Sequence, residues 1–151
     1  MKLGFTGTRE QLTQPQRAAL YRLMEDHFPF ELHHGDCIGA DAEANAIFNS
    51  IRKGSKGWIV IHPQLNTELR AFCVARLPLD EVRQPRPPLK RNQDIVNETD
   101  RLVACPGEYE EVLRSGTWST IRRALRARKQ VTILWPDGTA TLAYEYDQGH
   151  V

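Results

Sequence analysis

The sequence lacks the features of a membrane-embedded or disulfide-stapled protein. No stretch approaches the roughly 18 consecutive apolar residues of a membrane-spanning helix, and the first ten residues, MKLGFTGTRE, contain no apolar core of a secretory signal. The three cysteines, Cys37, Cys73 and Cys105, are far apart and odd in number, which argues against a disulfide framework and a cysteine zinc site. A soluble protein of a reducing cytoplasm is therefore expected.

The sequence also lacks an excess of charge of either sign. Its 20 lysines and arginines against 19 acidic residues give a formal net charge of +1, so strong nonspecific attraction to nucleic acid is not expected. A local basic patch stays open, because one predicted helix carries Arg122, Arg123, Arg126, Arg128 and Lys129. The 151 residues, 40% hydrophobic and 26% charged, predict one globular domain, residues 1–151.

The best-known nucleotide and hydrolase motifs are missing as well. The chain has neither a G-x-G-x-x-G fingerprint nor the G-K-[ST] of a P-loop. Ser115 and Ser119 do not lie in a nucleophile elbow, so no serine–histidine–aspartate triad is predicted. No internal repeat, low-complexity segment or domain linker interrupts the sequence.

Apolar runs alternate with helical patterns along the chain. Strands are predicted at residues 2–5, 30–34, 58–61, 100–105 and 131–135, with a short edge strand at 142–146. Helices are predicted at residues 12–28, 42–51, 89–96 and 117–129, and residues 69–77 could form another, whereas the prolines between 78 and 88 predict a loop. This alternation predicts an α/β, Rossmann-like, doubly wound and mainly parallel sheet of about five to six strands with helices on both faces.

Residues 106–123, PGEYEEVLRSGTWSTIRR, have the pattern of an anion site. A predicted strand ends before Pro106-Gly107, and Arg114-Ser115-Gly116-Thr117 forms a small polar turn that opens a helix. The first backbone N–H groups of a helix have no intrahelical partner, and the helix dipole adds partial positive charge there. The turn is therefore predicted to hold a phosphate group.

Other polar loops follow the strands at the same predicted edge of the sheet. Residues 6–9, Thr-Gly-Thr-Arg, follow the first strand; residues 35–41 follow the second, and His62 follows the third. Ligands of open parallel sheets bind outside the carboxyl ends of the strands. Convergence of these loops on one edge is the strongest functional indication that the pattern alone provides.

Several residues in these loops have a structural as well as a functional interpretation. Asp41 is either a helix cap or a ligand contact, whereas Asp36 is a candidate partner of a ribose hydroxyl. Gly39-Ala40 leaves room for a ligand against bare N–H groups. The adjacent His33 and His34 point to opposite faces of a strand, so no metal site is predicted.

Taken in order, these motifs resemble the SLOG superfamily over roughly residues 2–135. The matching residues are Gly7-Thr8-Arg9, Gly35-Asp36-x-x-Gly39-Ala40-Asp41, His62-Pro63, Arg91-Asn92, Thr99-Asp100 and Ser115-Gly116-Thr117. The superfamily includes the LOG phosphoribohydrolases, the Rossmann-like domain of DNA-processing protein A, and small stand-alone bacterial and phage proteins, which are the most similar. The resemblance implies a Rossmann-like fold and a nucleotide-derived ligand. Related proteins often pair through helices, so a homodimer or higher oligomer is a further expectation.

The resemblance carries over to catalysis only in part. Arg91 matches an arginine that serves catalysis in LOG enzymes. Their P-G-G-x-G-T-x-x-E motif begins similarly at Pro106-Gly107, but residues 108–113 are inserted here and Thr120 falls at the glutamate position. Threonine cannot act as a carboxylate base. The inserted Glu110 and Glu111 are the substitutes considered.

The sequence therefore predicts binding of a nucleotide or ADP-ribose-like ligand, as a sensor, carrier or sequestering protein, with no further cofactor. A LOG-type N-glycosidase using Arg91 and an acid supplied from residues 108–111, with Glu110 and Glu111 as the first candidates, is the alternative, and a single-stranded nucleic-acid binder is the third. The predicted ligand contacts are Thr6, Gly7, Thr8, Arg9, Gly35, Asp36, Gly39, Ala40, Asp41, His62, Arg91, Asn92, Arg114, Ser115, Gly116 and Thr117.

Overall fold

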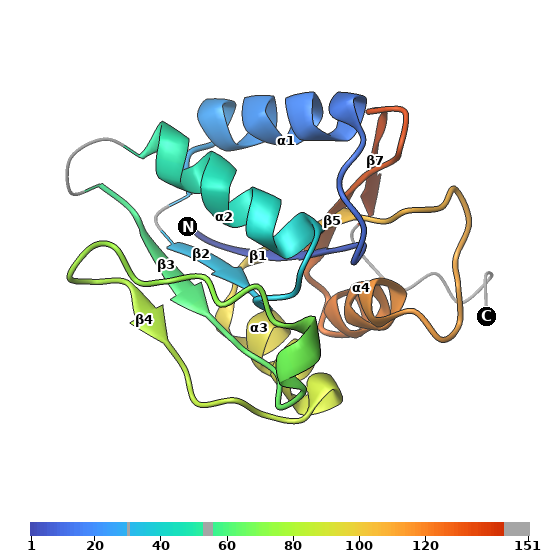
Figure 1. Ribbon diagram of the computed structural model, residues 1–151. Helices are drawn as coiled ribbons and strands as arrows, with labels where there is room; N and C mark the ends of the chain where they lie inside the picture. The colour runs from blue at the N-terminus through green and yellow to red at the C-terminus, as the bar shows by residue number, and fades with distance from the viewer. Residues whose placement is uncertain (30, 53–55, 144–151) are drawn as a thin grey trace.

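The computed structural model, which describes residues 1–29, 31–52 and 56–143, contains one seven-stranded sheet in the order β4-β3-β2-β1-β5-β6-β7 (Figure 1). Its strands are β1 (Lys2–Gly7), β2 (Glu31–His34), β3 (Trp58–Ile61), β4 (Glu81–Val82), β5 (Arg101–Cys105), β6 (Gln130–Leu134) and β7 (Ala140–Ala143). All neighbouring pairs are parallel except β6 and β7. The carboxyl ends of the central strands therefore meet at one edge.

Two helices cover each face of the sheet (Figure 1). The helices α1 (Gln14–Asp26) and α2 (Ala40–Ile51) lie on one face, and α3 (Pro88–Glu98) and α4 (Gly116–Arg126) lie on the other. Their starts follow local sequence signals: Thr13 and Gln16 form a capping box at α1, and the Ser115 hydroxyl accepts a hydrogen bond from the Trp118 N–H at α4. None of the described helices combines the length and apolar character needed to span a membrane.

Each face of the sheet has its own apolar core. Phe5, Leu20 and Phe48 belong to the larger cluster, which packs α1 and α2 against the strands. Trp118 and Ile121 belong to the smaller cluster beneath α4. Strands buried on both faces explain why β1, β3 and β5 read as continuous apolar runs.

The predicted α/β fold with a mainly parallel sheet is confirmed, with one strand more than expected. That strand is β4, which has two exposed residues and lies beyond β3 at the sheet edge. The predicted edge strand at 142–146 corresponds to β7, which begins at Ala140; residues 144–146 lie outside the described residues, as does residue 30 at the start of the second predicted strand.

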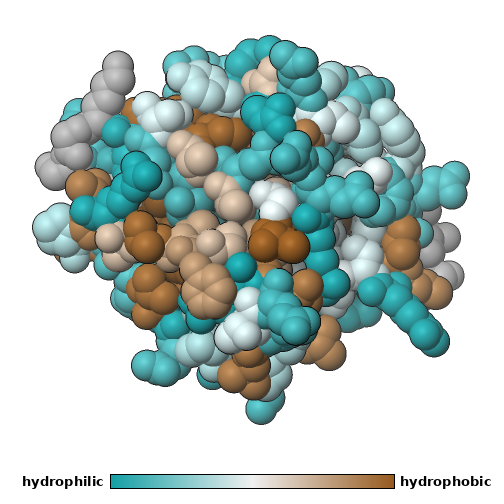
Figure 2. All heavy atoms as spheres, in the orientation of Figure 1, coloured by the Kyte–Doolittle hydropathy of each residue, from teal (hydrophilic) through white to brown (hydrophobic). Residues whose placement is uncertain are grey.

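The suggested helix over residues 69–77 is wrong. A single 3-10 turn, Thr67–Leu69, ends there, and the chain continues without helical structure. The backbone of Asp36 and its carboxylate hold this segment instead, because they accept hydrogen bonds from the N–H groups of Ala71 and Cys73. Phe72 and Val74 of this segment are exposed. Apolar side chains gather on part of the face shown in Figure 2.

Candidate functional site

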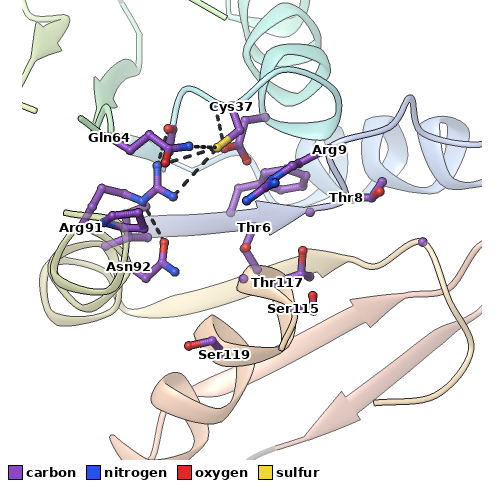
Figure 3. Close-up of a pocket in the computed structure, with 18 of the residues that line it drawn as sticks. Thr6, Thr8, Arg9, Cys37, Gln64, Arg91, Asn92, Ser115, Thr117 and Ser119 are labelled. Atoms are coloured by element: carbon purple, nitrogen blue, oxygen red, sulfur yellow. Dashed lines mark hydrogen bonds between the residues drawn. The ribbon is translucent and has the colours of Figure 1, made fainter. Parts of the chain in front are cut away.

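A cavity of about 820 Å³ opens at the carboxyl ends of the central strands. Its walls come from the loops after β1 and β2, the start of α3, and the loop and first turns of α4 (Figure 3). The structure brings the following predicted residues together in its lining: Thr6, Gly7, Thr8, Arg9, Gly35, Asp41, Arg91, Asn92, Arg114, Ser115, Gly116 and Thr117. The volume is that of a small-molecule site.

The start of α4 presents free backbone donors to this cavity. Ser115 caps the Trp118 N–H, whereas the N–H groups of Gly116 and Thr117 have no acceptor among the described residues. A Cβ built on Gly116 would meet nothing within 4 Å, so the space in front of this turn is open. Such an uncapped helix start favours an anion through both its donors and the helix dipole.

Arginine side chains around the cavity differ in how firmly they are held. The guanidinium groups of Arg9 and Arg114 have no hydrogen-bond or ion-pair partner among the described residues. Arg91 is buried; its Nη1 donates to the carbonyl of Gly35 at 2.5 Å, and its Nε donates to Asn92 Oδ1 at 2.8 Å. Arg91 is therefore preorganised, and the other two are available to an incoming anion.

Asp41 is a buried carboxylate with an unused oxygen. Its Oδ2 accepts a hydrogen bond from the Cys37 N–H at 3.1 Å, while Oδ1 has no partner among the described residues, although Asp41 lines the cavity. Burial raises the pKa of Asp41 above its usual range, against the opposing effects of His34, Arg91 and the Cys37 N–H. Buried polar atoms in proteins almost always have a hydrogen-bond partner. A ligand hydroxyl or amine could supply the donor that Oδ1 lacks.

Four predicted contacts do not line the cavity. Asp36 is fully buried, and its carboxylate accepts hydrogen bonds from Arg70 Nε at 3.0 Å and Cys73 N at 2.8 Å. His62 faces His33 instead, with a ring nitrogen 2.8 Å from His33 Nδ1.

The small size of Gly39 and Ala40 accommodates the backbone of the loop after β1, and neither residue lines the cavity. The Ala40 N–H donates to the carbonyl of Thr8 at 3.0 Å, so this helix start is already occupied. Gly39 has a φ of 91°, and a Cβ there would lie 2.3 Å from the carbonyl oxygen of Arg9. These two residues therefore clamp the loop that presents Thr8 and Arg9.

Of the acidic residues considered for catalysis, Glu110 and Glu111 lie away from the cavity lining. Glu111 pairs with Arg122 at 2.6 Å, and neither it nor Glu110 lines the cavity. Thr120 is buried, and its hydroxyl donates to the Gly116 carbonyl at 2.9 Å. Glu108 does line the cavity, but Trp118 Nε1 donates to it at 3.0 Å.

The structure also adds residues that the sequence reasoning missed. Ser119 and Arg122 line the cavity beside Ser115, and their spacing of four and seven residues along α4 could have revealed them. Gln64 and Cys37 complete the wall near Arg91 (Figure 3). Burial, followed by the charge of Asp41, raises the pKa of Cys37, so this thiol stays protonated and is a poor nucleophile.

Comparison with known proteins supports the fold and leaves the ligand open. No family model matches the chain, and no curated protein matches it. A solved structure, that of the molybdenum cofactor binding protein from the phototrophic bacterium Rippkaea orientalis, superposes with a TM-score of 0.64. The two are 21% identical, and the match covers 89% of this chain and 76% of the other. At this identity the likeness shows a shared α/β fold.

Proposed function

We propose that this protein binds a nucleotide or nucleotide-derived ligand, with a phosphate group at the start of α4. One observation carries the proposal. In a single cavity of about 820 Å³, the N–H groups of Gly116 and Thr117 and the guanidinium groups of Arg9 and Arg114 lie together, and none of them has a partner in the part of the chain that the structure describes. A phosphate would receive hydrogen bonds from the former and charge compensation from the latter.

The rest of the cavity suits the sugar and base of such a ligand. Asp41 Oδ1 lacks a donor and would accept a hydrogen bond from a ribose hydroxyl. Leu89 and Leu113 line the cavity with more than half of each side chain exposed, and they offer apolar surface to a flat ring. The cavity therefore offers both charged and apolar surface, which favours a ligand with both characters over free phosphate.

The resemblance to the SLOG superfamily and the structural neighbour support a small-ligand function. The neighbour is named as a molybdenum cofactor binding protein, and SLOG proteins bind nucleotide-derived compounds. A role as sensor, carrier or sequestering protein fits both. Binding is favoured over N-glycosidic hydrolysis, because the hydroxyl of Thr120 stands where LOG enzymes have a carboxylate and is bonded within α4.

A thermal-shift screen tests the proposal. Nucleoside mono- and diphosphates, NAD⁺, ADP-ribose and inorganic phosphate are added separately, and at least one nucleotide is expected to raise the melting temperature more than phosphate does. Arg9→Gln and Arg114→Gln should reduce that shift, whereas Arg22→Gln, on the exposed surface of α1, should retain it. Absence of any shift across the panel would sink the proposal.

Chromatography of the same mixtures separates binding from turnover. The ligand is expected to be recovered intact after prolonged incubation. Release of free base, dependent on Arg91, would instead establish the phosphoribohydrolase alternative.

A further inference from the structure

A second group of polar side chains lies on the sheet face that α3 covers. His33 is on β2, His62 directly follows β3, and Glu98 is the last residue of α3. One nitrogen of each imidazole and one carboxylate oxygen of Glu98 all lie within 4.8 Å of one another. These residues come from three separate elements, so the sequence pattern alone gave no sign that they meet.

The two imidazoles are oriented as a pair of ligands with a supporting carboxylate. His33 Nε2 lies 2.9 Å from Glu31 Oε1, and His33 Nδ1 lies 2.8 Å from His62 Nε2. With the Nε2 proton donated to Glu31, the Nδ1 lone pair of His33 faces His62. Metal-bound histidines usually have such a carboxylate on the second ring nitrogen, because it fixes the ring and its tautomer.

Both imidazoles are buried, with His33 1% and His62 3% exposed. Neutral imidazole is the species that binds a metal ion, through a ring nitrogen that carries no proton.

Solvent reaches the group from two sides. His33 and Glu98 border a hollow of about 520 Å³, and His62 and Glu98 border another of about 290 Å³. Arg83 borders both hollows and pairs with Glu98 at 2.7 Å. An ion therefore has an entry path, and the Arg83 guanidinium occupies the place of a cation beside Glu98.

We propose that His33, His62 and Glu98 form a binding site for a divalent transition metal ion such as Zn²⁺. Two imidazoles and one carboxylate favour a borderline-soft ion over Mg²⁺ or Ca²⁺, which prefer oxygen ligands. Three protein ligands leave a position for water from the adjoining hollows. The three proposed ligands lie outside the lining of the ligand cavity, although Arg91 borders both that cavity and the smaller hollow. The proposal does not rest on the function proposed for that cavity.

Binding requires only small movements. Ligand atoms on a tetrahedral Zn²⁺ lie roughly 3.3 Å apart, given bond lengths of about 2.0–2.1 Å. The facing imidazole nitrogens, now 2.8 Å apart, separate slightly, and Glu98 leaves Arg83 to approach them. Arg83 therefore competes with the metal for Glu98, and Arg83→Gln is expected to tighten Zn²⁺ binding by several-fold.

Titration of the metal-free protein with Zn²⁺ and Co²⁺ tests the site. Calorimetry should show one equivalent of Zn²⁺ bound, and Co²⁺ should produce the visible absorption of a four- or five-coordinate ion without a thiolate charge-transfer band. His33→Gln and His62→Gln should lose both signals. His34→Gln is the matched control, because this adjacent histidine faces α2 and bonds Asn45 at 2.9 Å.

Glu98→Gln keeps the test decisive if the histidine variants fail to fold, because the Glu98 side chain is 32% exposed at the end of α3. A folded Glu98→Gln protein that binds less tightly, with an altered Co²⁺ spectrum, supports the site. Wild-type affinity and spectrum in that variant, loss of binding in His34→Gln, or failure of Arg83→Gln to tighten binding would overturn it.

Discussion

At the scale of single residues, Asp41 lowers the stability of the free protein, because its carboxylate is buried and only one of its oxygens accepts a hydrogen bond from the described residues. Its carboxylate is 5% exposed, accepts one hydrogen bond from Cys37 N–H, and leaves Oδ1 without a donor. A buried acceptor without a partner costs the fold on the order of 1–3 kcal/mol. Under the proposed function a ligand donor would fill the position and recover that cost, so Asp41 is expected to matter more for binding than for folding.

Asp41→Asn should therefore stabilise the free protein at neutral pH. The folded-state pKa is raised above the unfolded value near 3.9, so the folded state holds more protons between these two values and stability falls as pH rises through that window. Because asparagine does not titrate, the stability of the variant does not fall over this pH window. Melting curves from pH 4 to pH 8 should show a stabilising difference that grows with pH, whereas a variant less stable than wild type at pH 7 would contradict the assignment.

The same substitution should weaken ligand binding by roughly tenfold, the worth of one hydrogen bond to a charged group. Calorimetric titration with the nucleotide that gives the largest thermal shift measures the change. Unaltered affinity would show that Asp41 Oδ1 does not receive the ligand.

Gly116→Val tests the phosphate position. The added side chain enters open space in front of the free N–H groups, so affinity should fall by at least about tenfold, whereas the free energy of unfolding should change by less than about 1 kcal/mol. Ala127→Val, at the far, exposed end of α4, is the matched control and should bind normally. Equal affinity of the Gly116 and Ala127 variants would contradict the site.

Residue roles were harder to predict than residue locations. The sequence placed Asp36 and Gly39 in the correct loop, but their partners lie in segments that no local pattern ties to them. Asp36 bonds Arg70 and Cys73, and Gly39 packs against the Arg9 carbonyl. Such long-range contacts decide whether an acidic residue meets a ligand or a neighbouring loop.

At the scale of elements, one buried ion pair fixes the segment that follows β3. Arg52, just after α2, donates two hydrogen bonds of 2.7 Å to the Asp80 carboxylate, and both side chains are almost fully buried. The same carboxylate accepts the backbone N–H groups of Ile59 and Leu77. Asp80 thus ties the chain before β4 to both α2 and β3.

Asp80→Asn should destabilise the protein by about 3–5 kcal/mol, because it leaves the Arg52 guanidinium buried without a charge partner. Burial raises the pKa of Asp80, but the hydrogen bonds from Arg52 and the backbone outweigh it and lower the pKa overall. Its contribution is therefore complete above about pH 4, the unfolded value, and is lost at lower pH. Denaturant unfolding at pH 7 and pH 3 should show a larger deficit at pH 7; an equal deficit would contradict the account. Asp26→Asn, exposed on α1, is the control.

Elements with strong local signals were predicted well. Apolar runs gave β1, β3 and β5 to within two residues, and the polar turn at residues 114–117 marked the start of α4. The failed helix over residues 69–77 and the missed β4 share one cause. Their conformation is set by Asp36, Asp80 and the edge of β3, and the sequence of the segment itself carries no such information.

For the whole molecule, sheet topology is what assembles the site. With β1 between β2 and β5, the loops after β1 and β2 and the turn opening α4 surround one space. Parallel strands with crossover helices impose this convergence, so it was predictable without knowing any side-chain contact. The lining of the cavity was harder to predict in full. Ser119 and Arg122 line it because they share a face of α4 with Ser115, and only the position of Ser115 at the cavity identifies that face.

The decisive experiment for phosphate binding at the start of α4 is a crystal structure of the protein with the nucleotide that gives the largest thermal shift. We expect a phosphate group within hydrogen-bond distance of the Gly116 and Thr117 N–H groups, with Arg9 or Arg114 turned toward it. A nucleotide bound elsewhere, with water alone at the start of α4, would rule out the proposed phosphate position.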